Sequence, residues 1–204
     1  MRPSNTTERR QEIADALRRV MATEGYQRAT VQRIAKEAGL APGLVHYHFE
    51  NKAEILASLI ASLVGRFEER IARRTAKRTE ALDVLDGTLE ALLSRGDDED
   101  LEAVRCWTLV GAEAVKDAEV RVLYEAHLST LTDRLAALVV DACHAEGRSG
   151  EGARAMAGTL VALAEGYFAL AAVSPALVAT GSASAMAKRT LRGLLGGQPR
   201  KEGS

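Results

Sequence analysis

Apolar residues recur every three or four positions along most of the 204-residue chain, which is the spacing of one face of an α-helix. No segment alternates apolar and polar residues in the manner of a half-buried β-strand. The pattern therefore predicts an all-α protein of about nine helices. We expect these helices near residues 7–24, 31–38, 42–49, 52–71, 80–94, 104–115, 118–145, 151–173 and 184–195, with an acidic stretch at 97–100 opening the sixth.

Helix-boundary residues support this division at the N-terminal end. Gly25 and Gly39 follow apolar stripes directly, where glycine favours a helix C-terminus. Thr30 and Asn51 precede the next stripes and predict side-chain N-caps. Pro42 falls in a first helical turn, where the missing N–H is not needed. Residues 30–49 are therefore expected to form two short helices joined by a tight turn.

Charge is distributed unevenly, although 27 basic and 28 acidic side chains nearly cancel over the whole chain. Residues 1–36 carry eight basic and four acidic side chains, whereas residues 80–125 carry four basic and thirteen acidic ones. This asymmetry favours a polyanionic partner for the N-terminal end, with ordinary solvated helix faces as the alternative.

Several other classes of protein are disfavoured. We expect no apolar run to reach the ~18–20 residues of a membrane span, and the N-terminus lacks the apolar block of a signal peptide. Cys106 and Cys143 lie far apart inside helical patterns, which argues against a disulfide framework or a zinc site. We therefore expect a cytoplasmic protein that contacts no membrane and holds no metal or cofactor.

The two short helices have the layout of a helix-turn-helix unit, whose second helix enters the major groove of DNA. At 100° per residue, one side of the second helix carries a glycine, a histidine and a tyrosine rather than charged residues. The residues on that side are Pro42, Gly43, His46 and Tyr47, with Leu44, Val45 and His48 opposite. Thr30 at a helix N-terminus and Lys52 are placed for phosphates.

The same stretch resembles the DNA-binding domain of the TetR family of one-component repressors. The matching residues are Thr30, Ile34-Ala35, Ala38-Gly39, Ala41, Gly43, Tyr47, Phe49 and Lys52, in the family's order and spacing. Ala41 departs from the serine that often caps the recognition helix, which implies a weaker cap. The expected DNA-binding residues are Thr30, Ala41, Pro42, Gly43, Leu44, His46, Tyr47 and Lys52.

Each of these residues also has a structural interpretation. Tyr47 could pack half-buried against the first helix, and His46 could be solvated. His48 and Phe49 are expected to pack the core of the three-helix unit. The arginines near this unit are assigned no specific contact and could add only diffuse positive potential; they are Arg9, Arg10, Arg28 and Arg33.

The resemblance implies a DNA-binding domain over residues 1–50, a ligand-sensing and dimerisation domain over 51–195, and a disordered tail over 196–204. Residues 101–135 are similar, more loosely, to the choline-responsive repressor branch of the family. Small residues in the eighth helix suit a close symmetric interface, and the ninth helix is its natural second element. The expected homodimer interface contains Ala157, Gly158, Ala162, Leu191 and Leu195, and a homodimer implies a palindromic operator in double-stranded DNA.

A small-molecule effector is expected among the fourth to eighth helices. Aromatic faces and a carboxylate could hold a cation there, although aromatic residues at helical spacing are more often core. His127 is a single histidine and gives no indication of a metal. The candidate pocket residues are Phe67, Trp107, Val110, Glu113, Tyr124, His127, Leu131 and Tyr167.

Two other classes of function remain as alternatives. An all-α enzyme would need a catalytic pattern, and the sequence shows no HExxH, glycine-rich phosphate loop or nucleophile beside a histidine. A helical adaptor would not need an outward glycine, histidine and tyrosine on a short helix. We therefore expect no enzyme but a DNA-binding transcriptional regulator, a repressor that a small molecule releases from its operator.

Overall fold

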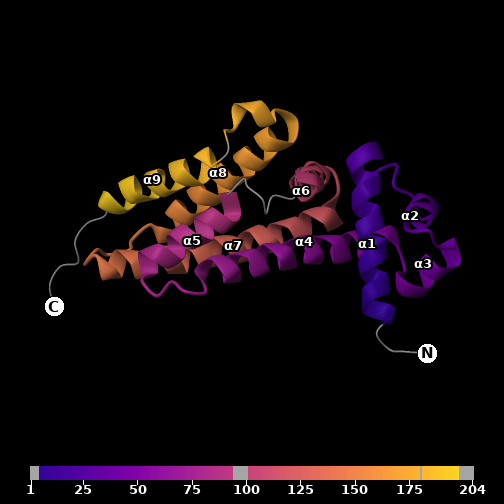
Figure 1. Cartoon of the computed structure of the whole chain (residues 1–204), viewed down its shortest axis with the longest axis horizontal. Helices are drawn as coiled ribbons and strands as arrows, with labels where there is room; N and C mark the ends of the chain where they lie inside the picture. The colour runs from indigo at the N-terminus through magenta and orange to yellow at the C-terminus, as the bar shows by residue number, and fades with distance from the viewer. Residues whose placement is uncertain (1–4, 94–100, 180, 198–204) are drawn as a thin grey trace. The chain divides into compact units, whose positions relative to one another are not determined.

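The computed structural model describes residues 5–93, 101–179 and 181–197, and these residues form nine α-helices, one 3₁₀ turn and no strand (Figure 1). The all-α prediction is confirmed. The expectations for residues 94 and 97–100 and for a tail over 198–204 lie outside the described residues. The helices are α1 Asn5–Glu24, α2 Val31–Ala38, α3 Pro42–His48, α4 Lys52–Thr75, α5 Ala81–Leu93, α6 Leu101–Ala114, α7 Ala118–Ala145, α8 Ala153–Val173 and α9 Ser182–Gly196.

The expected caps are present at the N-terminal helices. The Thr30 hydroxyl accepts a hydrogen bond from the Arg33 N–H at 3.2 Å, which satisfies a free donor of α2. Asn51 Oδ1 accepts from the Glu54 N–H at 2.9 Å at the start of α4. The helix α8 begins two residues later than expected, since Gly150 and Gly152 both adopt positive φ angles before it. The 3₁₀ turn η1, Pro175–Leu177, was not expected.

The chain divides into two compact units, and the division cuts through α4 and α7. Unit 1 consists of Met1–Arg66 and Asp100–Ala126, so it contains α1, α2, α3 and α6. Within it α1 packs against α2, α3 and α6 (Figure 1). Fully buried apolar side chains from three helices form its core: Ile13, Leu17 and Met21 of α1, Ile34 of α2, and Ile55 and Leu59 of α4.

This compact unit extends past residue 50, where the DNA-binding domain was expected to end, and it includes α6. A packing unit and a functional domain need not coincide, so the boundary at residue 50 stays a prediction. The helices α2 and α3 therefore belong to the same packed unit as α6.

Unit 2 consists of Phe67–Glu99 and His127–Ser204. In it α9 packs against α5 and α8, and the three helices lie side by side (Figure 1). Its core combines leucines and valines from four helices: Leu85 and Leu89 of α5, Leu135 and Val139 of α7, Leu160 of α8, and Leu191 and Leu195 of α9.

The helix α8 corrects one expectation from the sequence. Among the described residues it is the one helix long and apolar enough to span a membrane by length and composition, although no such segment was expected. It packs against α5, α9 and η1 as a core helix of unit 2 does. Only 33% of its apolar stretch is buried inside the chain, so much of α8 has no cover from its own unit.

Candidate DNA-binding surface

The turn between α2 and α3 sets the direction of the recognition helix. Gly39 has φ 68°, a left-handed conformation that side-chain-bearing residues adopt at a cost, and its N–H donates to the Lys36 carbonyl at 3.2 Å. The Leu40 N–H donates to the Ala35 carbonyl at 2.9 Å, which completes the termination of α2. Ala41 then begins α3 with no side-chain cap, and Pro42 occupies its first turn. The weaker cap expected at Ala41 is therefore present.

The two sides of α3 differ sharply in exposure. Val45 is 1% exposed and Phe49, which ends the helix, is 2% exposed, so both face the core of unit 1. Tyr47 is 80% exposed, which excludes the alternative that it packs against α1. His46 is also exposed, and Leu44, placed on the inner side by helical spacing, is 38% exposed. The ring and hydroxyl of Tyr47 are therefore available to a partner outside the chain.

Gly43 has no neighbour inside its own chain that requires a glycine. A Cβ atom at this position would meet nothing within 4 Å, although glycine in a helix costs about 1 kcal/mol relative to alanine. The absence of a side chain at this exposed position leaves room for an external backbone or base to approach α3. Gly43 and Tyr47 therefore both lie on an open, exposed side of α3.

Thr30 lies at the N-terminus of α2 with an exposed side chain. Its oxygen accepts from the Arg33 N–H, so the hydroxyl hydrogen can be donated outward. The helix N-terminus adds partial positive charge, which favours an anion such as a phosphate.

Lys52 makes two contacts inside the protein. Its Nζ donates to the Tyr26 carbonyl at 3.0 Å and lies 4.0 Å from the centre of the Tyr26 ring. These contacts tie the start of α4 to the turn between α1 and α2. The phosphate contact expected for Lys52 stays a prediction, since an ammonium group has two further N–H donors.

The arginines of this unit hold its helices together. Arg10 donates to Glu54 at 2.8 Å and to the His48 carbonyl, and its guanidinium lies 4.0 Å from the centre of the Phe49 ring. The pKa of the Glu54 carboxyl lies below its usual range because it accepts hydrogen bonds from Arg10 and from the Glu50 N–H. The pairs Arg19–Glu37 and Arg33–Glu24 likewise join α1 to α2, whereas the pair Arg9–Glu12 lies within α1.

The expected dimer residues separate into two groups. Ala157, Leu191 and Leu195 are at most 2% exposed within a single chain, so their side chains face the core of unit 2. Their place at a dimer interface stays a prediction, although side chains packed inside one chain are not exposed to another. Ala162 is exposed and Gly158 is half-buried, so both can still meet a partner.

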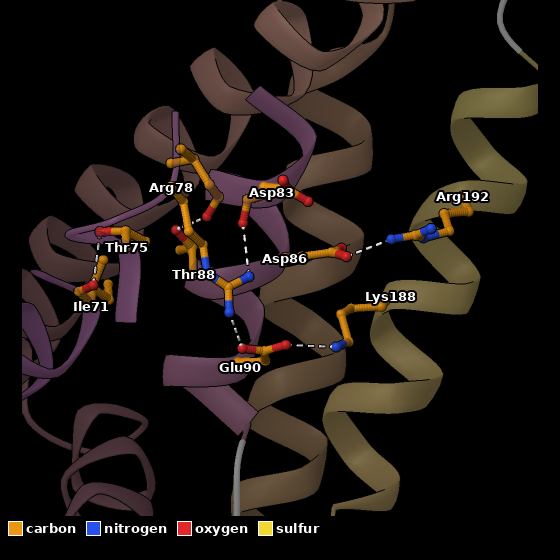
Figure 2. Close-up of polar contacts among 10 residues, drawn as sticks. Ile71, Thr75, Arg78, Asp83, Asp86, Thr88, Glu90, Lys188 and Arg192 are labelled. Atoms are coloured by element: carbon orange, nitrogen blue, oxygen red, sulfur yellow. Dashed lines mark hydrogen bonds and ion pairs between the residues drawn. The ribbon is translucent and has the colours of Figure 1, made fainter. Parts of the chain in front are cut away.

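Polar contacts also fix α9 on α5 (Figure 2). Glu90 accepts from Arg78 at 2.6 Å and from Lys188 at 2.7 Å, and Asp86 pairs with Arg192 at 2.5 Å. Burial acts to raise the pKa of Glu90, but the pairs with Lys188 and Arg78 outweigh it and the pKa is lowered. A Cβ atom at Gly87 would lie 2.9 Å from Arg78 Nε, so this glycine makes room for the guanidinium. The network sets the position of α9, and with it the outer side of that helix.

The candidate effector residues fall into both compact units. Trp107, Val110, Glu113 and Tyr124 belong to unit 1, while Phe67, His127, Leu131 and Tyr167 belong to unit 2. Trp107 and Tyr124 stack with ring centres 4.9 Å apart, and a Cβ at Gly111 would lie 3.0 Å from the Tyr124 hydroxyl. Tyr124 therefore lies along α6 over Trp107 and Gly111.

The remaining candidates have structural surroundings. Val110 is fully buried and Leu131 belongs to the core of unit 2. Burial lowers the pKa of His127, although the nearby Glu68 carboxylate opposes this change. No group of three or more His, Cys, Asp or Glu side chains placed to hold a metal occurs within residues 5–93, 101–179 and 181–197.

Glu113 has a partner that the sequence did not reveal. Its buried carboxylate accepts a hydrogen bond from Gln27 Nε2, in the turn between α1 and α2. Tyr26 next to it is 7% exposed, and its pKa is raised to about 12 by burial and by the charges of Asp117, Glu113 and Glu119. The apolar pattern predicts a buried face on α6 but cannot say which polar group meets a carboxylate within it.

Family models match two parts of the chain. Residues 13–59 match the model described as "Bacterial regulatory proteins, tetR family". Residues 81–196, more than half of the chain, match the model described as "BetI-type transcriptional repressor, C-terminal".

Individual proteins are similar to this chain either in sequence over a short stretch or in fold over nearly its whole length. The fatty acid metabolism regulator protein of Bacillus subtilis is 45% identical over 47 residues, which are 23% of this chain and 24% of that protein. A transcriptional regulator from a Rhodococcus species has the same fold, with a TM-score of 0.78 at 23% identity, over 93% of this chain and 97% of that one. A structure from Saccharomonospora viridis solved in complex with choline has a TM-score of 0.70 at 21% identity, over 95% of this chain and 100% of that one.

Proposed function

Because the chain belongs to the tetR family of bacterial regulatory proteins, we propose that it is a repressor that binds operator DNA through the outer side of α3 and the N-terminus of α2. The observation that carries this proposal is the exposure of Tyr47 beside Gly43 on a helix that packs against the core through Val45 and ends at the buried Phe49. The match to the Bacillus subtilis protein spans only about a quarter of that protein's length. The regulated genes and effector are therefore not inferred from it.

In this proposal Tyr47 and His46 contact phosphates or base edges in the major groove, and Gly43 lets the helix backbone approach them closely. Thr30 donates its hydroxyl hydrogen to a phosphate at the N-terminus of α2. Ala41, Pro42 and Leu44 border this surface and are exposed, and Lys52 contributes a phosphate contact from the start of α4. The protein acts by binding rather than by catalysis, in the cytoplasm.

The experiment is selection of bound duplexes from random DNA by the full-length protein, followed by footprinting on the selected duplex. The expected footprint is two-fold symmetric, with half-sites about one helical turn or a multiple of it apart. Replacement of Tyr47 by Ala should raise the protein concentration needed for the footprint by about 5–150-fold without changing the helical circular dichroism. Selection of no common sequence, or an unchanged footprint with Tyr47→Ala, would overturn the proposal.

A homodimer formed through the outer sides of α8 and α9 supplies the second DNA-binding surface. Along α8, the exposed residues Ala162, Gly166, Leu170 and Val173 lie at helical spacing, and on α9 Met186 is 48% exposed. A Cβ at Gly166 or Gly158 would meet nothing within 4 Å inside the chain, so a close partner helix accounts for these glycines. A second copy of α8 and α9 would cover the apolar surface of α8 that its own unit leaves exposed.

The effector in this proposal is a small, partly apolar cation bound beside Trp107 and Tyr124. Aromatic faces attract cations, and the buried Glu113 carboxylate lies on the same helix as Trp107. The structural neighbour that holds choline makes choline the first compound to test. Binding should change Trp107 fluorescence and weaken operator affinity by about 5–150-fold. If compounds that release DNA leave Trp107 emission unchanged, the effector site lies elsewhere.

A further inference from the structure

The turn between α1 and α2 is held from two directions. On one side Lys52 of α4 bonds to the Tyr26 carbonyl. On the other side the last turn of α6 presents Glu113, which accepts from Gln27 Nε2. Residues 25–30 connect α1 directly to the Thr30 cap of α2, so whatever fixes Gln27 also fixes the N-terminus of α2.

The contact between Gln27 and α6 involves a buried carboxylate. Glu113 is 6% exposed, and a carboxylate that has lost its water requires hydrogen-bond donors. The helices α1 and α6 pack together, and Arg18 of α1 pairs with Glu102 at the first turn of α6 at 3.2 Å. Both ends of α6 are therefore bonded to the N-terminal part of unit 1: Glu102 pairs with Arg18, and Glu113 accepts from Gln27.

The position of Glu113 along α6 is also informative. Gly111, over which Tyr124 lies, is two residues before it, and Trp107 is six residues before it. The Glu113 carbonyl accepts from the Lys116 and Asp117 N–H groups at 2.9 Å, which closes the turn into α7. A small rotation or shift of α6 at Trp107 would move the carboxylate away from Gln27, because a helix of fourteen residues moves as a rigid element.

We propose that Glu113 is a positioning residue of the DNA-binding surface. Its carboxylate holds Gln27, and through the turn at residues 25–30 it sets Thr30 and α2 in the orientation that meets DNA. A shift of α6 would then change the position of α2 directly, without a movement of α4. The inference rests on the proposed DNA-binding function.

The test uses the full-length protein and the duplex selected above. Gln27→Glu places a second carboxylate beside Glu113, and the repulsion should weaken operator affinity by about tenfold. Gln27→Ala removes the donor and should weaken affinity less. Glu113→Gln keeps an oxygen that can accept from Gln27 and should retain most of the wild-type affinity, whereas Glu113→Ala should not.

Two readouts distinguish positioning from general destabilisation. Amide hydrogen exchange at residues 26–31 should accelerate in Gln27→Glu while exchange in the α9 amides stays unchanged. Glu119→Gln is the control, since Glu119 is exposed near Tyr26 and makes no hydrogen bond to Gln27. It should leave both affinity and exchange as in the wild type.

The outcomes separate this inference from the proposed function. If the wild type selects no duplex, the proposed function fails and the inference fails with it. If the wild type binds but Gln27→Glu and Glu113→Ala bind equally well, only the role of Glu113 is overturned. Loss of affinity in Glu119→Gln as large as in Gln27→Glu would assign the effect to the overall negative charge and would also overturn it.

Discussion

The helices α3 and α9 carry apolar or aromatic residues at helical spacing, yet the structure uses them in opposite ways. On α3 the aromatic Tyr47 points away from the protein and is 80% exposed. On α9 the apolar Leu191 and Leu195, expected at an interface with another chain, are buried in the core of their own unit. Residues that follow the amphipathic pattern, such as Leu191, thus indicate only burial, whereas Tyr47, which breaks it, is left exposed to the outside.

The largest expected effect comes from a charge in the buried part of α9. Leu191→Glu should lower the free energy of unfolding by about 3–5 kcal/mol or more, because it leaves a cavity and an unpaired charge in the core of unit 2. Thermal unfolding followed by circular dichroism measures this loss. The matched variant Met186→Glu, at an exposed position of the same helix, should weaken self-association and leave the melting temperature nearly unchanged. A folded monomer from Leu191→Glu would contradict the burial of this side chain.

The next effect compares two tyrosines of the reading unit. Tyr47→Ala should weaken operator binding by about 1–3 kcal/mol, since a contact to DNA is lost, and should change folding stability by less than about 0.5 kcal/mol. Tyr26→Ala should instead destabilise the unit, because that ring is buried under Lys52. Titration of the labelled duplex and thermal unfolding separate the two. Tyr47→Phe, which keeps the ring and removes the hydroxyl, shows which part of the side chain meets DNA.

Replacement of Gly166 should raise the stability of the monomer but weaken the dimer. Gly166→Leu should stabilise the folded monomer by up to about 1 kcal/mol, since glycine disfavours helix and the site is open within the chain. The same variant should raise the dimer dissociation constant at least tenfold, because the larger side chain separates two closely packed helices. Sedimentation over a concentration series measures the second quantity. A more stable protein that still dimerises as the wild type does would place the interface elsewhere.

The smallest effect concerns the network between α5 and α9. The pKa of Glu90 is lowered in the folded protein, so its stabilisation is present above the usual value of about 4.5 and is lost as pH falls through the folded value. Glu90→Gln should cost about 1 kcal/mol at neutral pH, and the difference from the wild type should shrink below about pH 4. Urea unfolding at several pH values measures it. An equal deficit at every pH would mean that packing, rather than charge, provides the stabilisation.

The helical fold, the helix caps and the exposed side of α3 could be predicted from the sequence. These features depend on residues close together in the chain: Thr30 caps the helix that begins one residue later, Gly39 provides the left-handed turn, and Tyr47 breaks the pattern of its own helix. Their physical causes act within a few residues, so they can be read from order and spacing.

Which buried faces meet follows from the tertiary packing and not from the sequence pattern. That packing placed Leu191 and Leu195 inward, paired Gln27 with Glu113 across 86 positions of sequence, and bound Lys52 to the Tyr26 carbonyl. Each of these depends on how helices distant in sequence pack, and an apolar stripe has the same spacing whether its partner is its own core or a second chain. The packing of the helices therefore placed Glu113 beside Gln27 in unit 1, and it left exposed the sides of α8 and α9 at which we propose that the dimer forms.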